Sequence, residues 1–254
     1  MSDTRTRLRR EPPPLRRLEV RRTTPRSVRM MRLVVGGSEL DGLELLEPAA
    51  SIRLLVPWPD EPFDLPSWNG NEFLLSDGRR PLLRTFTPVK VDGDELTIDI
   101  VRHPGGGVSA WVEQAQPGDP CAVSGPGRGE TIDSSAARYL LLGDETAIPA
   151  IEQLLDAIPE STKIDVHIEL GHPAARIELP PHPQATITWH DAAANEPPGG
   201  SLRRTIEAAV IDNATRVWAA SEAASVQAIR KHLFEQRDVP RAHTTIRGYW
   251  KVPR

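Results

Sequence analysis

Cysteine is nearly absent from this chain, and its absence narrows the possible functions. Cys121 is the only cysteine among 254 residues, which excludes an internal disulfide and a cysteine-rich metal or iron–sulfur site. His167, His172 and His182 share neither a helical face nor the spacing of metal ligands, so we predict no metal site. A redox function would therefore need a bound organic cofactor.

Long apolar runs are missing as well. No stretch approaches the roughly 20 apolar residues of a transmembrane helix, and the N-terminus has no apolar segment typical of a signal peptide. We therefore expect a cytoplasmic protein without membrane contact. Residues 1–17 are rich in Arg and Pro and predict a disordered, solvated tail. No basic surface with interleaved aromatic residues follows it, so we expect no binding of nucleic acid. We also expect a monomer.

Residues 18–125 show the pattern of a small β domain. Short segments of β character alternate with turn sequences such as Gly36-Gly37. The predicted strands are Leu18–Arg22, Val28–Val35, Ile52–Val56, Leu82–Val91, Leu96–Arg102 and Cys121–Ser124. Six such strands indicate an antiparallel six-stranded β-barrel. Residues 126–137, which are rich in Gly, Ser and charged side chains, predict a linker.

Residues 138–254 alternate strands with helices, which indicates an α/β domain with a parallel sheet covered on both faces. The predicted strands cover residues 138–143, 163–170, 185–190, 215–220 and 242–250, and the predicted helices cover 146–158, 201–210 and 221–237. Ligands of such sheets bind beyond the carboxyl ends of the strands. The first strand is followed by GDETAIPA rather than by GxGxxG, so the usual dinucleotide motif is absent.

Two stretches of the β domain, RTFTP from Arg84 and DIVRHPGGGVSAW from Asp99, together indicate a flavin site. Arg84 offers a planar fork for phosphate, Phe86 a ring to lie against a flavin, and Thr87 a hydroxyl donor. Three consecutive glycines end at Gly107, where a helix start would favour a pyrophosphate. Each stretch alone also fits an ordinary barrel strand or an ordinary loop before a helix.

These motifs carry a family resemblance. A barrel strand of the form R-x-aromatic-T, followed by LLLGDETAIPAIEQLL, WAASEA and a final GYWK, resembles the siderophore-interacting proteins of the ferredoxin reductase superfamily. That family comprises FAD-dependent ferric-siderophore reductases. The resemblance extends from about Leu18 to Lys251 and implies a flavin-binding barrel joined to an NAD(P)H-binding α/β domain.

The resemblance assigns roles residue by residue. It implies that the cofactors FAD and NADH or NADPH contact Arg84, Thr85, Phe86, Thr87, His103, Gly107, Val108, Ser109, Asp144, Glu145, Thr146, Glu222, Tyr249 and Trp250. Arg53, Arg247 and Lys251 are the expected contacts of an anionic ferric siderophore. His103 also fits a structural role, Asp144 and Glu145 also fit helix capping, and the aromatic pair Tyr249 and Trp250 also fits a hydrophobic plug.

The chain departs from the family pattern at several of these positions. Phe86 stands where Tyr is usual, which removes one hydroxyl, and Ala220-Ser221 stands where a glycine is usual. His190-Asp191 offers no Arg for the 2'-phosphate of NADPH, so we predict that NADH serves at least as well.

The resemblance implies electron transfer from NAD(P)H through FAD to the iron of a ferric siderophore, with no side chain acting as acid, base or nucleophile. Two alternatives remain open. In the first, the chain is a general NAD(P)H–flavin reductase. In the second, it is a flavin-binding module that uses no pyridine nucleotide and has no enzymatic activity. A reduced ferredoxin is a further candidate for the electron donor.

Overall fold

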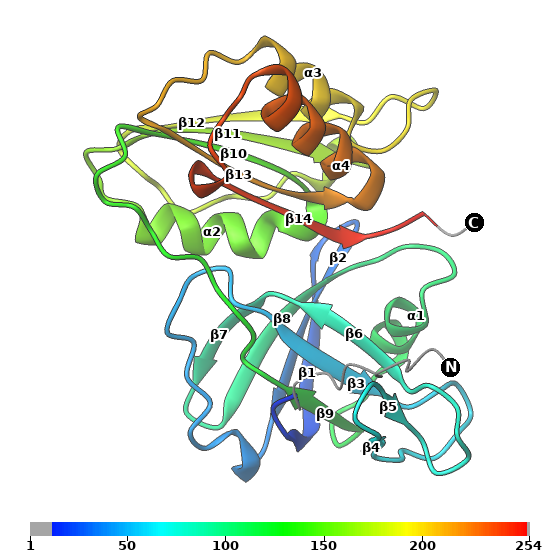
Figure 1. Ribbon diagram of the computed structural model, residues 1–254. Coiled ribbons are helices and arrows are strands. Elements are labelled where there is room, and N and C mark those ends of the chain that lie inside the picture. Colours follow the sequence, from blue (N-terminus) through cyan, green and yellow to red (C-terminus); the bar gives the residue numbers. More distant parts are fainter. Residues whose placement is uncertain (1–11, 253–254) are drawn as a thin grey trace, which may run out of the picture. The chain divides into compact units, whose positions relative to one another are not determined.

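The computed structural model describes residues 12–252, which form two compact units (Figure 1). The first unit contains the described residues up to Thr24, then Met31–Leu45 and Ala50–Arg128. The second contains Pro25–Met30, Leu46–Ala49 and the residues from Gly129 onward. Most of the predicted N-terminal tail, residues 1–11, lies outside the described residues, whereas its last residues, from Leu15, belong to the first strand.

The first unit is built on an antiparallel sheet of seven strands in the order β6-β3-β9-β1-β2-β8-β7. Its strands are β1 (Leu15–Ser27), β2 (Met30–Gly36), β3 (Ile52–Val56), β6 (Leu82–Phe86), β7 (Pro88–Asp92), β8 (Glu95–Val101) and β9 (Pro120–Ser124). A separate hairpin, β4 (Ser67–Trp68) with β5 (Phe73–Leu74), stands outside this sheet. The helix α1 (Gly107–Gln114) and a short 3-10 turn (Ser38–Leu40) complete the unit.

The prediction of a six-stranded barrel was wrong in two respects. The sheet has seven strands, and within the described residues its order is open from β6 to β7 rather than closed. The extra strand arises because the single predicted strand Leu82–Val91 is divided after Phe86. Pro88 has no N–H to donate to a strand ladder, and the pairing of β7 with β8 shifts register between Pro88 and Lys90.

Apolar alternation places the core of this unit on one face of the sheet. Leu96, Ile98 and Ile100 on β8 are almost fully buried, as their spacing predicts. Asp99, which points away from them, is also buried and is satisfied by a two-pronged ion pair with Arg32 at 2.8 and 2.9 Å. The helix α1 contributes Val108 and Val112 to the same core.

The second unit contains a five-stranded parallel sheet in the order β12-β11-β10-β13-β14, as predicted. Its strands are β10 (Arg138–Asp144), β11 (Lys163–Leu170), β12 (Ala185–Asp191), β13 (Thr215–Glu222) and β14 (Thr244–Trp250). The helix α2 (Ile148–Ala157) covers one face, and α3 (Gly200–Ala208) with α4 (Ala223–Lys231) covers the other (Figure 1). Short turns are formed by Glu145–Ala147, Pro173–Ala175, His232–Gln236 and Arg241–His243. The strand order reverses between β10 and β13, which is where ligands bind in sheets of this kind.

Helix boundaries in the second unit differ from the predicted ones at one functional position. The predicted helix 221–237 is the shorter α4 followed by a π-turn at His232–Gln236, and Ser221 and Glu222 end strand β13 instead. Glu222 caps α4 by accepting hydrogen bonds from the backbone N–H groups of Ala224 and Ser225. Among residues 12–252, no helix has the length and hydropathy needed to cross a membrane.

Candidate functional site

The predicted flavin strand β6 presents an arginine without a carboxylate partner. Arg84 and Thr85 are exposed, and Phe86 is half-buried against the core. The guanidinium of Arg84 donates to the neighbouring carbonyl of Leu83 at 2.9 Å and forms no ion pair within the described part of the chain. It is therefore available to an anionic ligand. Thr87 is buried at the break between β6 and β7.

The helix α1 brings its N-terminus next to that strand. Gly106 is the N-cap and supplies no side-chain acceptor, so the first N–H groups of the helix have no side-chain partner. A Cβ on Gly107 would lie 2.9 Å from both methyl groups of Leu82, two residues before Arg84. This close approach places the helix N-terminus beside the strand that carries Arg84. A phosphate group between them would meet both a guanidinium and free backbone donors.

His103 and Ser109 are joined at the same turn. The backbone N–H of His103 donates to Ser109 Oγ at 3.0 Å, and a Cβ on Gly106 would lie only 2.3 Å from the His103 ring. Ser109 and Val108 are buried, whereas His103 is exposed. Both predicted ligands therefore shape the turn, and of the two only His103 has an exposed side chain.

A large cleft opens beside Arg84 within the first unit. Its volume is about 1200 Å³. The residues that line it are Pro12, Pro13, Pro14, Arg53, Trp58, Trp68, Asn71, Glu72, Phe73, Arg80, Pro81, Leu83, Arg84, Pro126, Gly127 and Arg128. The cleft thus contains the predicted substrate residue Arg53 and the predicted flavin residue Arg84.

Several residues of this cleft were missed by the sequence analysis. Arg128 lies in the predicted linker, and Trp68 lies in a segment for which no strand or site was predicted. Trp68 and Phe73 instead face each other across the small β4–β5 hairpin, with ring centroids 5.2 Å apart and edge-on at 64°. The turn sequence between them, with Asn69 Oδ1 accepting from the N–H groups of Asn71 and Glu72, was the available indication of a hairpin.

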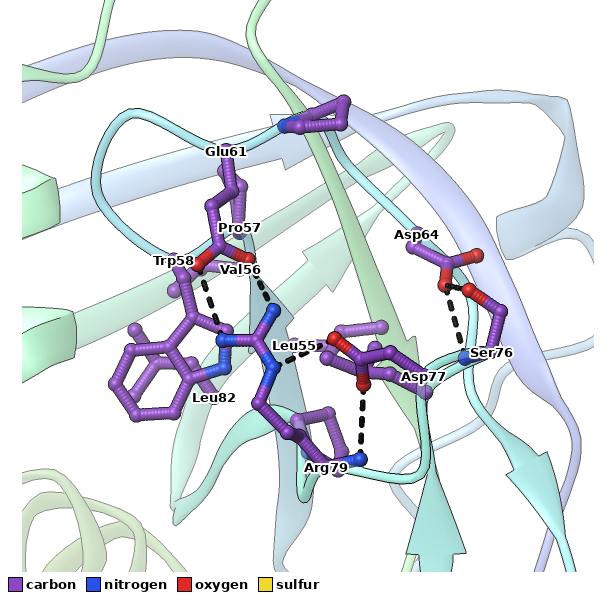
Figure 2. A pocket seen from close by; sticks show the side chains of 13 residues that line it. Leu55, Val56, Pro57, Trp58, Glu61, Asp64, Ser76, Asp77, Arg79 and Leu82 are labelled. Carbon is purple, nitrogen blue, oxygen red and sulfur yellow. Dashed lines mark hydrogen bonds and ion pairs between the residues drawn. The ribbon is translucent and has the colours of Figure 1, made fainter.

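The segment that carries these aromatic residues is fixed by polar contacts around a smaller pocket (Figure 2). Arg79 donates to both carboxylate oxygens of Glu61, at 3.0 and 2.8 Å, and to Asp77 at 2.6 Å. The Arg79 guanidinium holds the pKa of Glu61 below its usual range, and the Arg79 backbone N–H together with its guanidinium does the same for Asp77. Asp64 accepts from the hydroxyl and backbone N–H of Ser76 on the opposite side. The loop between β3 and β6 is therefore tied at several points.

In the second unit, Asp144 lies where the strand order reverses, and both of its carboxylate oxygens accept hydrogen bonds. Its carboxylate accepts from the N–H and hydroxyl of Thr146, from Ser221 Oγ at 2.7 Å and from Trp250 Nε1 at 2.7 Å. Burial raises the pKa of this carboxyl, and its hydrogen bonds oppose the rise. Two predicted nucleotide contacts, Asp144 and Thr146, and the predicted flavin contact Trp250 thus form one network.

Other predicted residues of this unit also have internal partners. Glu145 pairs with Arg29 at 2.8 Å, and burial raises the pKa of Glu145. Arg247 donates to the carbonyls of Ala49 and Gly129 and lies 3.6 Å from Glu130. Lys251 is exposed just beyond β14. The ring of Tyr249 packs edge-on against Trp218 at 6.3 Å.

The carboxyl ends of β11 and β12 carry a second polar network. Glu169 accepts from the N–H groups of Gly199 and Ser201 and from the Ser201 hydroxyl, so a carboxylate of the chain itself occupies the N-terminus of α3. His190 Nε2 lies 3.1 Å from His167 Nδ1, and burial lowers the pKa of both imidazoles. Arg176 lies 3.8 Å from Asp191, although both side chains are about half exposed.

Comparison with known proteins identifies two domains of a known family in this chain. Residues 19–130 match the siderophore-interacting FAD-binding domain, and residues 136–252 match the siderophore-interacting protein domain. The NADPH-dependent ferric-chelate reductase of Escherichia coli is 34% identical over 56% of this chain, and the match spans 57% of that protein.

Solved structures agree with the domain matches. A siderophore utilization protein from T. fusca is 32% identical, with a TM-score of 0.82 over 95% of this chain and 94% of that one. A ferredoxin reductase of carbazole 1,9a-dioxygenase shares the fold alone, with 13% identity and a TM-score of 0.69 over 94% of this chain and 70% of that one. The chain therefore belongs to the siderophore-interacting protein family.

Proposed function

We propose that this protein is an FAD-dependent reductase that passes electrons from NADH or NADPH to a ferric siderophore, so that iron is released. The observation that supports the proposal is the contact of Gly107, at the N-terminus of α1, with Leu82, two residues before Arg84 on β6, in a unit that matches a siderophore-interacting FAD-binding domain. The reaction would take place in the cytoplasm, where reduced nicotinamide nucleotides are available.

The residues of the first unit fit a flavin nucleotide. The diphosphate would be held by the Arg84 guanidinium and by the N–H groups of Gly107 and Val108. Phe86 presents a half-buried ring that would limit the position of the flavin, and Thr85 and His103 offer exposed polar groups beside it. Phe86 lacks the hydroxyl that Tyr would provide, which removes one hydrogen bond and leaves the ring contact intact.

The chain supplies binding and orientation in this proposal rather than acid or base catalysis. FAD held by Arg84 and the N-terminus of α1 would supply the conversion between a two-electron hydride donor and single-electron reduction of iron(III). Arg53 and Arg128 would attract the anionic chelate within the cleft. Reduction favours release, because iron(II) binds hard oxygen ligands more weakly than iron(III). Lys251, which is exposed, remains a candidate contact, whereas Arg247 is already bound to backbone carbonyls.

The first test is the flavin content of an Arg84→Ala variant. Loss of a charge-assisted pair typically costs about 1.5–3 kcal/mol, so the dissociation constant for FAD should rise by about 10- to 150-fold. Absorption spectra of the purified proteins and FAD titration of the apoprotein measure this change. Arg22→Ala, which removes an exposed arginine paired with Glu95, is the matched control. Equal FAD content in the parent and the Arg84→Ala protein would overturn the assignment of β6.

A second candidate function retains the flavin and replaces the nucleotide by a protein donor. The observation that favours it is the internal occupation of the strand ends, where Asp144, Glu169 and Glu222 bind donors of their own unit. Anaerobic titration distinguishes the two. Reduction of the flavin by NADH or NADPH supports the first function, and reduction only by a reduced ferredoxin supports the second. Reduction coupled to a ferric chelate excludes a non-enzymatic module, and retention of FAD through turnover excludes a reductase that uses flavin as a substrate.

A further inference from the structure

The first unit contains a charged pair on the face of its sheet that points away from the core. Arg32 on β2 donates through Nε and Nη2 to the two carboxylate oxygens of Asp99 on β8, at 2.8 and 2.9 Å. The Asp99 side chain is completely buried, whereas about a third of the Arg32 side chain, 34%, is exposed. A carboxylate that has lost its contact with water in this way needs a compensating charge, and Arg32 supplies it.

The strands do not need this pair in order to stay together. β2 and β8 are neighbours in the seven-stranded sheet, so main-chain hydrogen bonds already join them. A buried ion pair can often be replaced by apolar side chains without loss of stability. The pair of Arg32 and Asp99 therefore indicates that charged groups are required at this place for a reason other than folding.

The neighbour of this pair along the sheet is Thr87, a predicted flavin contact. β7 begins its pairing with β8 where Pro88 stands opposite Ile98. Because the two strands are antiparallel, Thr87, one residue before Pro88, lies beside Asp99, one residue after Ile98. Thr87 is buried, and Pro88 has no N–H to donate to the strand ladder. Side-chain contacts therefore have a larger share in fixing the chain at Thr87.

We propose that Arg32 and Asp99 form a positioning pair for the flavin, an inference that rests on the proposed function. Asp99 holds the segment at Thr87 in the orientation that presents its hydroxyl to the flavin ring, and Arg32 balances the charge of the carboxylate. Neither Arg32 nor Asp99 needs to touch the cofactor. Because buried charges are poorly screened, the balance between these two sets the energy of adding electrons to a nearby flavin.

Two single substitutions with opposite effects on charge test this role. Arg32→Gln leaves the carboxylate unbalanced and should lower the midpoint potential of bound FAD, whereas Asp99→Asn leaves the guanidinium unbalanced and should raise it. The double variant should return close to the potential of the parent. Arg32→Lys keeps the charge without the planar fork and should also stay close to the parent. Equilibration of the FAD-loaded protein with a reference dye at fixed pH measures the potential and needs no nicotinamide nucleotide.

A second ion pair on the same strand is the matched control. Arg22 on β1 donates to both carboxylate oxygens of Glu95 on β8, at 2.7 and 2.9 Å. This pair has the same two-pronged geometry, but both side chains are partly exposed and Glu95 lies four residues before Asp99. Arg22→Gln and Glu95→Gln should therefore leave the flavin potential unchanged, because solvent screens these charges.

A double-mutant cycle tests whether Asp99 acts through Thr87. Thr87→Val removes the hydroxyl and should raise the dissociation constant for FAD by about two- to tenfold, as measured by fluorescence titration of the apoprotein. In the Asp99→Asn background the same substitution should have almost no further effect, because the hydroxyl is no longer held in place. Should Asp99→Asn fail to fold, Arg32→Gln provides the background. Additive effects would show that Asp99 does not act through Thr87 and would overturn the positioning role.

The outcomes separate this inference from the proposed function. If the parent binds FAD and the two single variants leave its potential unchanged, or shift it in the same direction, the positioning pair is overturned while the reductase proposal stands. Opposite shifts without any reduction of a ferric chelate would support the pair and reject the reductase function. A parent that binds no FAD would reject both.

Discussion

Asp144 is a buried carboxylate whose acceptor oxygens are shared by three other residues. Thr146, Ser221 and Trp250 all donate to it, and they come from the turn after β10, from β13 and from β14. Burial of an ion is costly unless donors of this kind surround it. One side chain thus ties the ends of three strands at the place where a nucleotide is expected, and the stability of the site depends on its acceptor oxygens.

Replacing Asp144 by Asn tests that dependence. The amide NH2 would face groups that are themselves donors, so we expect the free energy of unfolding to fall by about 1–3 kcal/mol. Urea denaturation followed by far-ultraviolet circular dichroism measures the change. Asp156→Asn, an exposed position on α2, should stay within about 0.5 kcal/mol of the parent. A small loss in Asp144→Asn would show that solvent replaces these hydrogen bonds.

At the scale of elements, periodicity predicted the parallel strands well because each is a short apolar run bounded by helices. Periodicity failed where a single residue interrupts a strand. Leu82–Val91 has β character throughout, yet Pro88 divides it into two strands. Periodicity also does not predict that the side chain of Glu222 accepts a hydrogen bond from the N-terminus of α4 and so caps that helix. The hairpin residues Trp68 and Phe73 were missed because strands of two residues are too short to show a periodic pattern. The cleft that they line was missed because its residues are distant from one another in the sequence.

The N-terminus of α3 provides a test of an element boundary. Gly199 is its N-cap in a left-handed conformation, with φ of 76°, and a Cβ there would lie 1.9 Å from Ser225 Oγ. Gly199→Ala should therefore lower the free energy of unfolding by more than the roughly 1 kcal/mol that a left-handed alanine costs. Gly42→Ala separates strain from crowding, since Gly42 has a similar φ of 72° and no neighbour within 4 Å. Equal losses in the two variants would contradict the crowding argument.

At the scale of the whole molecule, several exposed carboxylates are stabilised in the folded state. The hydroxyl and N–H of Ser135, together with Arg216, lower the pKa of Asp133 to about 2. Hydrogen bonds from Ser76 and Thr215 lower the pKa values of Asp64 and Asp212. Burial acts in the opposite direction on Asp144 and Glu145. A fall in pH therefore weakens the contacts of Asp133, Asp64 and Asp212, whose pKa values are lowered. Asp144 and Glu145, whose pKa values are raised, become protonated at a higher pH than ordinary carboxyl groups.

The contribution of Asp133 can be isolated by its pH dependence. The folded pKa lies below the unfolded value of about 3.9, so its stabilisation is present above about pH 4 and is lost as the pH falls towards 2. Asp133→Asn should lower Tm at pH 6 and converge with the parent near pH 2. Melting curves between these values, with Asp41→Asn as an exposed control, measure the convergence. A constant offset at all pH values would show that the effect is not electrostatic.

Donor preference depends on the charges at the end of β12. Burial holds the pKa of His190 below its ordinary value, so the imidazole is neutral at pH 7. Arg176 lies 3.8 Å from Asp191. At this sheet edge the 2'-phosphate of NADPH would have to compete with Asp191 for Arg176. We therefore expect NADH to reduce the flavin at least as well as NADPH.

Stopped-flow reduction under anaerobic conditions, across a concentration series of each nucleotide, tests this preference. Asp191→Asn removes the partner of Arg176 and leaves its charge for the phosphate, so this variant should gain about two- to fivefold in apparent affinity for NADPH, as expected for an exposed ion pair worth up to about 1 kcal/mol. NADH should be almost unaffected, because it has no 2'-phosphate. A clear advantage of NADPH in the parent would reject the preference, and an equal gain for both nucleotides would place the 2'-phosphate away from Arg176.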